Sequence, residues 1–355
     1  MKKTFNSLKI KKTFAFLLVL VCTASIGGHS VLAKTGTKAT NKKTIQAARM
    51  ISGMFDFIKN SNKDKYIPNT KDEITIKVYF HKEKIVRQMS LDDYISGVLY
   101  GEVPSYYCEE ALKAQAIAAR SYTLYRIYNG ISHAGGADIC TDYTHCQAWT
   151  PREENSVYPE AITKAVKATE NIIATYNGKC INALYFSNSG GNTEAIENVW
   201  GGSPCPYLKS VSSPGEADFY DYCQVKSYSL SDFANAVTNY NSSAVCDNEA
   251  GTANVKNIKR SPSGRIISAE IGGITFTGLQ IRAMFSLRSS NIYFSDVHSG
   301  EGSSSVAIVA LGYGHGVGMS QCGAQAMALN GADYEEILKH YYTGIELSQI
   351  TSLQE

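Results

Sequence analysis

The sequence predicts an α+β fold with mixed helices and short strands around a main core. Residues 106–128 are apolar on almost every side, and a helix with that pattern is buried. Several short segments are instead rich in β-branched residues or alternate between apolar and polar residues, as strands do. Helices and strands follow one another without a regular strand–helix–strand repeat, which favours α+β over a parallel sheet. The 355 residues, 44% of them apolar, are enough for one large domain or two small ones.

The first half of the chain is predicted to begin with a hairpin. Residues 74–79 alternate, and 85–89 can pair with them because 81–84 form a polar turn. A short helix is predicted over 91–99 and is expected to break at 101–104, since the residue before a proline avoids helical angles. Ser105 is a suitable cap for the buried helix over 106–128. A loop over 130–151, a helix over 159–169 and a strand over 180–186 follow.

The second half is predicted to contain a smaller inserted lobe, at about residues 203–300. Residues 203–263 are polar and show little regular pattern, apart from a helix over 231–238. Strands are predicted over 265–271, 274–276 and 306–311, and a helix over 277–285. A glycine-rich run at 312–320 leads into a helix that ends at residue 329. A last helix covers 334–342.

The N-terminal segment carries the excess of positive charge. Residues 1–43 contain nine lysines and no acidic residue, and the rest of the chain has 25 basic against 32 acidic residues. This mildly acidic remainder lacks the basic footprint of a nucleic-acid-binding protein, so no nucleic-acid partner is expected. Residues 13–33 contain no charged side chain and are long enough to span a bilayer, and the lysines before them favour a cytoplasmic N-terminus.

These features divide the chain into three parts. Residues 1–33 are predicted to be a cytoplasmic tail with a transmembrane signal anchor, 34–69 an extracytoplasmic linker, and 70–355 a catalytic domain. The expected location is the cell membrane, with a single N-terminal anchor and the catalytic domain outside. A cleaved signal peptide is the alternative, because the densest apolar stretch, 14–21, is short and 31–33 resembles a cleavage site.

Glu102 is the candidate general acid. It lies between a helix break and a buried helix, among apolar neighbours such as Leu99 and Val103. Apolar surroundings raise the pKa of a carboxyl group, as a general acid at neutral pH requires. The alternative is a surface glutamate near a helix N-terminus, where the helix dipole favours negative charge.

Lys113 and Arg120 share one face of the same predicted helix, about 10 Å apart. Lysine and arginine are almost never fully buried unless they are paired. On so apolar a helix, the two side chains are expected either to line a cleft or to form internal salt bridges.

His133, Cys140, His145 and Cys146 fall within one loop and are candidate metal ligands. Two thiolates and two imidazoles form a standard tetrahedral Zn²⁺ set, and four protein ligands indicate a structural site. The alternative is a disulfide between Cys140 and Cys146 in an oxidising compartment. Bridges between Cys205 and Cys223, or between Cys223 and Cys246, are also open.

The motifs of other enzyme classes are missing from the sequence. It contains no phosphate-binding loop, no dinucleotide fingerprint and no Gly-x-Ser-x-Gly elbow. No pair of carboxylates stands out either, whereas an ordinary glycosidase uses two. A single outstanding glutamate indicates a route that needs one carboxyl group. His315 lies among alternating glycines, which allow a backbone to approach a ligand closely.

Three blocks of sequence, taken in order, resemble the stage II sporulation protein D family, which is related to amidase enhancer proteins. The first is Gly-Glu-Val-Pro at 101–104 followed by residues 111–122, and the second is Ser-Asn-Ser-Gly-Gly at 187–191 with 199–201 and 206–208. The third is Gly-His-Gly-Val-Gly-Met-Ser-Gln at 314–321. The resemblance covers about residues 70–345. One departure is Cys322, where the family usually has tryptophan.

The resemblance implies a peptidoglycan lytic transglycosylase that cuts MurNAc–GlcNAc bonds to 1,6-anhydro ends during sporulation and engulfment. Glu102 matches the family's acid/base. Lys113 and Arg120 match positions that hold the glycan, and Tyr185 and His315 are expected to bind substrate in a groove between the core and the inserted lobe.

The resemblance also implies partners and a metal. The Cys/His loop resembles that of a zinc-binding subset of the family. The implied substrate is peptide-free glycan, and the implied partners are an amidase that strips stem peptides and a membrane engulfment complex. Two other functions remain open: a non-catalytic activator of a cell-wall amidase, and a zinc hydrolase that uses the Cys/His loop.

Overall fold

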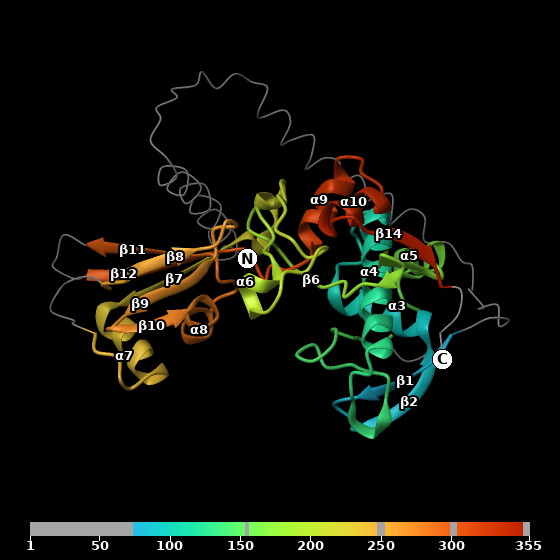
Figure 1. The fold of residues 1–355 in the computed structure, drawn as a ribbon, viewed down its shortest axis with the longest axis horizontal. Helices are drawn as coiled ribbons and strands as arrows, with labels where there is room; N and C mark the ends of the chain where they lie inside the picture. The colour runs from blue at the N-terminus through green and yellow to red at the C-terminus, as the bar shows by residue number, and fades with distance from the viewer. Residues whose placement is uncertain (1–73, 153–155, 247–252, 299–303, 351–355) are drawn as a thin grey trace, which may run out of the picture. The chain divides into compact units, whose positions relative to one another are not determined.

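The computed structural model describes residues 74–152, 156–246, 253–298 and 304–350 (Figure 1). All of them belong to one compact unit, Asn60–Glu355; the chain's other unit is Met1–Lys59. The predicted anchor over 1–33 and the linker over 34–69 lie outside the described residues. Within the described ranges, no helix has the length and apolar character needed to cross a bilayer.

The described part of the chain is a mixture of eight α-helices and five small sheets of two or three strands, which confirms the predicted α+β class. Its buried apolar side chains gather into three clusters. The first two lie on either side of one long helix, and the third lies within the β-rich part of the chain.

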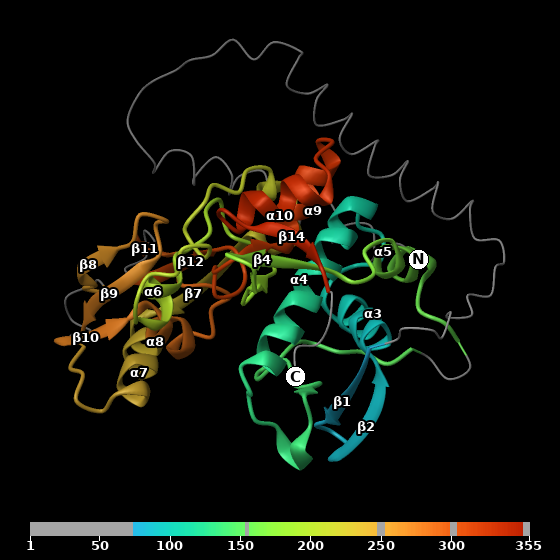
Figure 2. The same ribbon diagram turned by 45° about the vertical axis from the view of Figure 1, so that its right-hand side comes forward.

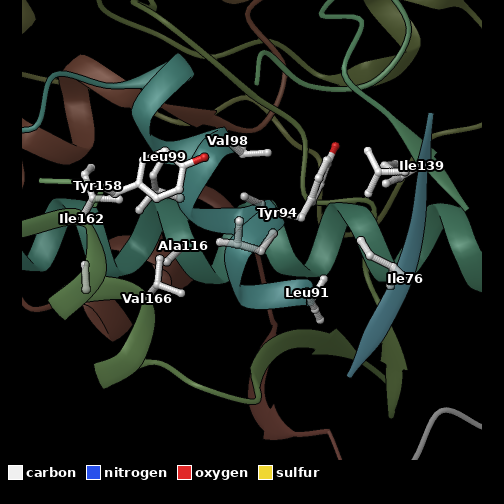
Figure 3. Packing of buried hydrophobic residues seen from close by; sticks show 14 of the residues in the cluster. Ile76, Leu91, Tyr94, Val98, Leu99, Ala116, Ile139, Tyr158, Ile162 and Val166 are labelled. Carbon is white, nitrogen blue, oxygen red and sulfur yellow. The ribbon is translucent and has the colours of Figure 1, made fainter. Parts of the chain in front are cut away.

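The first core joins a small sheet to two helices. Strands β1 (Thr75–Phe80) and β2 (Ile85–Ser90) pair antiparallel, and the short β3 (Ile139–Cys140) pairs parallel to β1. Helix α3 (Leu91–Glu102) contacts β2, and α5 (Glu160–Ala168) packs against α3 and contributes to the same core. Figure 3 shows side chains from all these layers, including Ile76, Tyr94, Ile139 and Val166, around the same apolar interior.

Helix α4 (Glu109–Tyr128) contributes to two cores at once. Its Leu112, Ala116 and Ala119 pack in the first core, whereas Ala114, Ile117 and Ala118 pack in the second. In Figures 1 and 2 the helix runs through the helical part of the molecule, with α3 and α5 as neighbours as well as α9 and α10. This arrangement explains why the helix is apolar all round.

The second core is closed by the end of the described chain. Helices α9 (Gln321–Leu329) and α10 (Tyr334–Tyr341) pack against α4. Strand β14 (Glu346–Gln349) pairs antiparallel with β4 (Ile172–Tyr176), which also pairs with β5 (Lys179–Cys180). The short β13 (Met319–Ser320) pairs parallel to β6 (Tyr185–Phe186).

The third core belongs to a β-rich lobe, drawn in yellow and orange in Figure 1. One sheet has the order β11 (Ile292–His298), β12 (Ser304–Leu311), β7 (Cys223–Ser229), and the other has the order β10 (Ile274–Thr277), β9 (Ile266–Ile271), β8 (Lys256–Arg260). Helices α7 (Leu230–Tyr240) and α8 (Gly278–Met284) complete it.

The structure corrects several predicted boundaries. Helix α3 does not end at 99 but continues to Glu102, because the restriction before proline acts on Val103, which is extended with φ −133° and ψ 147°. Helix α4 begins at Glu109 with Cys108 at its N-cap, so Ser105 does not cap it. The strand predicted over 180–186 is two short strands, and β7, β8 and β11 were not predicted.

Candidate active site

Glu102 ends helix α3 and is half-buried. Proline at 104 forces Val103 out of the helix, so the chain turns away directly after the glutamate. The Val103 N–H still donates to the Leu99 carbonyl at 3.0 Å. The carboxyl group is thus fixed at the end of a packed helix and is not on a free loop.

Two donors from distant segments hold the Glu102 carboxyl group. The Ala148 N–H donates to Oε1 at 2.7 Å, and the Gln321 Nε2 donates to Oε2 at 3.2 Å. Burial raises the pKa of Glu102, and these two hydrogen bonds oppose that rise without cancelling it. Within the described ranges, no second carboxylate contributes to the shift of this pKa.

Tyr185 lies in strand β6, close enough to Glu102 for the charge of that carboxylate to reinforce the effect of burial on the Tyr185 pKa, which is raised. Its hydroxyl donates to Gln147 Oε1 at 2.7 Å, and the Gln147 Nε2 donates to Thr123 Oγ1 at 2.9 Å. Gln147 is buried. This chain of hydrogen bonds fixes the position of the Tyr185 hydroxyl.

His315 is packed between two aromatic rings, 5.5 Å from Phe186 and 5.1 Å from Trp200 between ring centroids. Its Nδ1 accepts from the Val317 N–H at 3.0 Å. Burial lowers its pKa to about 4, although a hydrogen bond with the Tyr185 backbone opposes that shift. The neutral His315 ring is hydrogen-bonded to the backbone of Val317 and to that of Tyr185, and the second bond helps to hold strand β6 in place. Trp200, which is 52% exposed, is the more accessible aromatic surface here and was not singled out from the sequence.

Lys113 and Arg120 follow the ion-pair alternative. Lys113 Nζ lies 2.7 Å from Glu109 and 2.9 Å from Glu110. Arg120 is 0% exposed and pairs with Asp92 at 3.1 Å.

The Arg120 guanidinium also donates to three backbone carbonyls, those of residues 166, 169 and 172. It therefore ties α3, α4 and the segment after α5 together. In this conformation the side chain has no surface from which to contact a glycan, contrary to the role that the resemblance implied.

The four Cys/His side chains do converge. The donor atoms of His133, Cys140, His145 and Cys146 all lie within 4.8 Å of one another. Three sulfur–nitrogen separations measure 3.1, 3.4 and 3.5 Å. Tetrahedral zinc with usual Zn–S and Zn–N bond lengths requires about 3.6 Å between such donors, so the set fits a Zn²⁺ ion.

The cysteines of this set are not bridged to each other. The bridges considered from the sequence between Cys205 and Cys223 and between Cys223 and Cys246 are likewise not formed among the described residues. The hydrogen bond with Cys146 lowers the pKa of Cys140 to about 5. A thiolate is the form that a metal binds.

The Cys/His set and the surroundings of Glu102 share one segment of chain. Cys146 is followed directly by Gln147, which accepts from Tyr185, and by Ala148, which donates to Glu102. The conformation of the loop at Cys146 therefore sets the position of groups on both sides of the carboxyl group. The roles of Gln147, Ala148 and Gln321 were not predicted from the sequence, although Gln321 ends the third block and the other two directly follow Cys146.

Two further carboxylates, Glu194 and Glu216, are fully buried around residues 187–191, each 1% exposed. Glu216 accepts from the Ser189 N–H at 2.8 Å, the Ser189 hydroxyl at 2.5 Å, the Gly190 N–H at 3.1 Å and the Ser213 hydroxyl at 2.7 Å.

Glu194 is surrounded in the same way. It accepts from the Ala195 N–H and the Asn198 amide, both at 2.9 Å, and from the hydroxyls of Ser261 and Ser263. Glu216 thus fixes the loop at 187–191, which belongs to the second sequence block, and Glu194 joins residues 195–198 to the segment that carries Ser261 and Ser263.

Cys322, at the position where the resembling family usually has tryptophan, is buried at the start of α9. Its N–H donates to the Ser187 carbonyl at 2.9 Å, and its sulfur lies 3.7 Å from the Tyr107 hydroxyl. The substitution leaves the neighbouring Gln321 in contact with Glu102.

The fold and the site together define a class of protein. It has an α+β fold and a single half-buried glutamate at the site, and the segment that holds this glutamate follows a Cys₂His₂ loop. Residues 79–176 match the profile of the stage II sporulation protein family (SpoIID). Stage II sporulation protein D of Bacillus amyloliquefaciens is 32% identical over 296 residues, which cover 80% of this chain and 82% of the relative. The protein of the same name from Bacillus subtilis (strain 168) is 32% identical over 285 residues, covering 78% of this chain and 79% of the relative.

The chain therefore belongs to the stage II sporulation protein D family. It is also related to the amidase enhancer of Bacillus subtilis (strain 168), which is 28% identical over 298 residues, or 72% of this chain and 40% of the relative.

Proposed function

We propose that the protein is a peptidoglycan lytic transglycosylase that acts during sporulation and cuts the MurNAc–GlcNAc bonds of glycan strands to 1,6-anhydro ends. The observation that carries the proposal is the state of Glu102. Its carboxyl group is half-buried, its pKa is raised, and it is held by two neutral donors with no acidic partner among the described residues. A raised pKa increases the share of the carboxyl group that is protonated at a given pH, which is the direction that a general acid needs.

One carboxyl group is enough for both steps of this reaction. Glu102 protonates the glycosidic oxygen as the bond from the MurNAc C1 breaks, and the leaving sugar departs with a new hydroxyl. The resulting carboxylate then takes the proton of the C6 hydroxyl of the same MurNAc, whose oxygen bonds to C1. Glu102 ends protonated again, and no water is consumed.

The donors around Glu102 suit both of its states. The Ala148 N–H can donate only to an oxygen that carries a lone pair, and each carboxyl oxygen keeps one in either state. The two hydrogen bonds offset only part of the rise in the Glu102 pKa that burial causes. The carboxyl group can therefore give up a proton and recover it within one cycle.

We further propose that the Cys/His set holds a structural Zn²⁺. Four protein ligands close the coordination sphere, so the ion would supply stability to the loop and no open position for a substrate. As a ligand of this ion, Cys146 would fix the start of the segment in which Gln147 bonds to Tyr185 and Ala148 bonds to Glu102.

The location and partners that the resemblance implies are part of this proposal. They are a single N-terminal membrane anchor with the catalytic domain outside, a peptide-free glycan substrate, an amidase partner and a membrane engulfment complex. Support for the amidase comes from the relative named amidase enhancer.

That same relative favours one alternative function, a non-catalytic activator of a cell-wall amidase. In that case Glu102 would be a contact residue, and the chain would stimulate a hydrolase without cutting glycan itself. The two functions make opposite predictions for the purified protein acting alone.

The test is incubation of residues 34–355 with peptide-free glycan strands, followed by mass spectrometry of the products. A Glu102→Gln protein is run beside it. Anhydro ends from the first and none from the second are expected. Reducing ends would mean that water enters and that a second carboxylate acts. No product from either protein, even with zinc restored, would reject the enzyme and favour the activator.

A further inference from the structure

One exposed group of side chains in the β-rich lobe has no role in the function proposed above. We call it the Arg288 cluster; it consists of Tyr220, Asp221, Arg288 and Tyr313. The Arg288 guanidinium carbon lies 5.4 Å from the centre of the Tyr220 ring and 5.3 Å from that of Tyr313. Tyr220 is 89% exposed and Tyr313 is 42% exposed. Two tyrosine rings on the surface therefore flank one cation.

The cluster is built on fixed backbone. The Arg288 N–H donates to Gln224 at 2.9 Å, and the Arg288 carbonyl accepts from the Gly314 N–H at 2.9 Å. Tyr313 exchanges two backbone hydrogen bonds with Asn188, of 2.7 and 3.0 Å. These bonds hold four separate segments together, so the surface is preorganised, which reduces the entropy lost when a ligand binds.

Contacts connect the cluster to Glu102 through few residues. Asp221 accepts from the Ser187 hydroxyl at 3.5 Å, and the Ser187 carbonyl accepts from the Cys322 N–H at 2.9 Å. Cys322 follows Gln321, which donates to Glu102. A polymer whose scissile bond lies at Glu102 also presents its neighbouring units, and this run of direct contacts links the Arg288 cluster to that position.

The chemistry of the cluster suits an acidic sugar. Tyrosine offers an apolar ring face and a polar edge. A guanidinium has five N–H donors in a planar fork that matches a carboxylate, and Asp221 pairs with it through Nη1 at 3.0 Å. The Asp221 and Arg288 side chains are 31% and 26% exposed, so the pair is open to a ligand at the surface.

We propose that the Arg288 cluster is a glycan subsite that binds the lactyl carboxylate of N-acetylmuramic acid, with Tyr220 and Tyr313 packing against sugar rings. This inference rests on the proposed function and extends it to specificity. In peptide-free glycan the lactyl carboxyl group is free and charged. When a stem peptide is attached, the same carbon is an amide with no charge for Arg288 to bind. The cluster thus distinguishes stripped strands from unstripped ones.

Binding is measured on the full-length chain that carries Glu102→Gln, so that no turnover interferes. The ligands are peptide-free glycan strands and the same strands with their lactyl carboxylates converted to amides. The free-carboxylate strands should bind at least about 10-fold more tightly, the scale of one charge-assisted hydrogen-bond pair. Arg288→Gln should remove that preference. Tyr220→Ala should weaken both ligands by a similar factor.

Arg87→Gln is the matched control, because Arg87 also lies over an aromatic ring, 4.7 Å from the centre of Phe80, but in strand β2 of a different sheet. It should leave the preference unchanged. Tyr220 is almost fully exposed, so Tyr220→Ala tests the cluster even if Arg288→Gln fails to fold. An unchanged preference in a folded Arg288→Gln protein, or unchanged binding in Tyr220→Ala, overturns the inference. Because binding is read without cleavage, a wild-type protein that does not cut rejects the enzyme but leaves this result standing.

Discussion

Glu102 and Glu216 are both withdrawn from water, yet the protein surrounds them differently. Glu216 is 1% exposed and accepts four hydrogen bonds, three of them on one oxygen. Glu102 is half-buried and accepts two, one of them at 3.2 Å. Hydrogen bonds on both oxygens tie Glu216 to the surrounding backbone and hydroxyls, whereas burial with few donors raises the pKa of Glu102 and leaves it a proton to exchange. The comparison separates a structural carboxylate from a chemical one.

The largest effect is expected from Glu102→Gln, which tests whether Glu102 is the chemically active carboxyl group. Loss of the acid/base should reduce glycan cleavage at least about 10³-fold, while the fold persists. Since burial holds the folded-state pKa above its unfolded value, ionisation of Glu102 destabilises the fold as the pH rises through the folded-state pKa. Glutamine cannot ionise, so the variant should match the wild type at low pH and be the more stable protein at pH 8. Cleavage assays and thermal unfolding at both pH values check this. A variant that cuts, or that unfolds more easily at pH 8, would contradict the assignment.

Glu216→Ala should destabilise the fold, in contrast to Glu102→Gln. It leaves four buried donors without their acceptor, and we expect a loss of about 3–5 kcal/mol in the free energy of unfolding. Denaturant titration measures it. Glu335→Ala is the control, because the Glu335–Lys339 pair is on the surface, where water screens it, and its loss should change the free energy of unfolding very little. A loss for Glu216→Ala as small as that of the control would mean that the buried carboxylate is not structural.

Removal of the metal should loosen the surroundings of Glu102 and leave those of Glu216 unchanged. Cys146→Ser, or a chelator, should abolish stoichiometric zinc binding and lower activity about 10- to 100-fold, because the segment that carries the Ala148 N–H loses its anchor. Hydrogen exchange should show faster exchange at Ala148 and unchanged protection at Gly190, which donates to Glu216. Equal loss of protection at both amides would indicate general unfolding.

The smallest effect is expected from Gln321→Leu. The Gln321 hydrogen bond lowers the pKa of Glu102, so its removal should raise that pKa further. The reaction needs the protonated carboxyl group first, and the alkaline limb of the pH–rate profile should therefore move to higher pH, by roughly one unit or less. Gln325→Leu, on the same helix but bonded to Cys108, should leave the limb where it is. A shift to lower pH in Gln321→Leu would contradict the geometry.

The local sequence pattern was enough to predict the helices and strands whose buried positions recur with the period of the element. Helix α4 was predicted because it is apolar on every side, and β9, β10, α7 and α8 were found from their periodicity. Strand β8 was missed because most of its side chains are exposed and polar, so no alternation marks it. Strands β3, β6 and β13 have two residues each and are defined only by the partner that they find in space.

The candidate site was predictable in part for the same reason. Glu102 stands out because a helix break and apolar neighbours lie in its own sequence, and the Cys/His set because its members share one loop. The groups that hold Glu102 left no such signal: Ala148 donates through its backbone, which any residue but proline provides, and Gln321 lies far along the chain. For Arg120 the sequence allowed a cleft or an internal pair, and only packing shows that its neighbours supply acceptors on several sides.

The placement of α4 between two cores has a consequence for the newly made chain. Its partners in the second core, including Met319 and the helices α9 and α10, are translated about 200 residues later, which at usual rates of synthesis means roughly 10–40 s. During that interval the second core holds only its earlier members, such as Ala174, Ile181 and Leu208. A chain truncated before α9 would therefore lack the two helices that complete this core, and apolar side chains of α4 such as Ile117 would stay in contact with water.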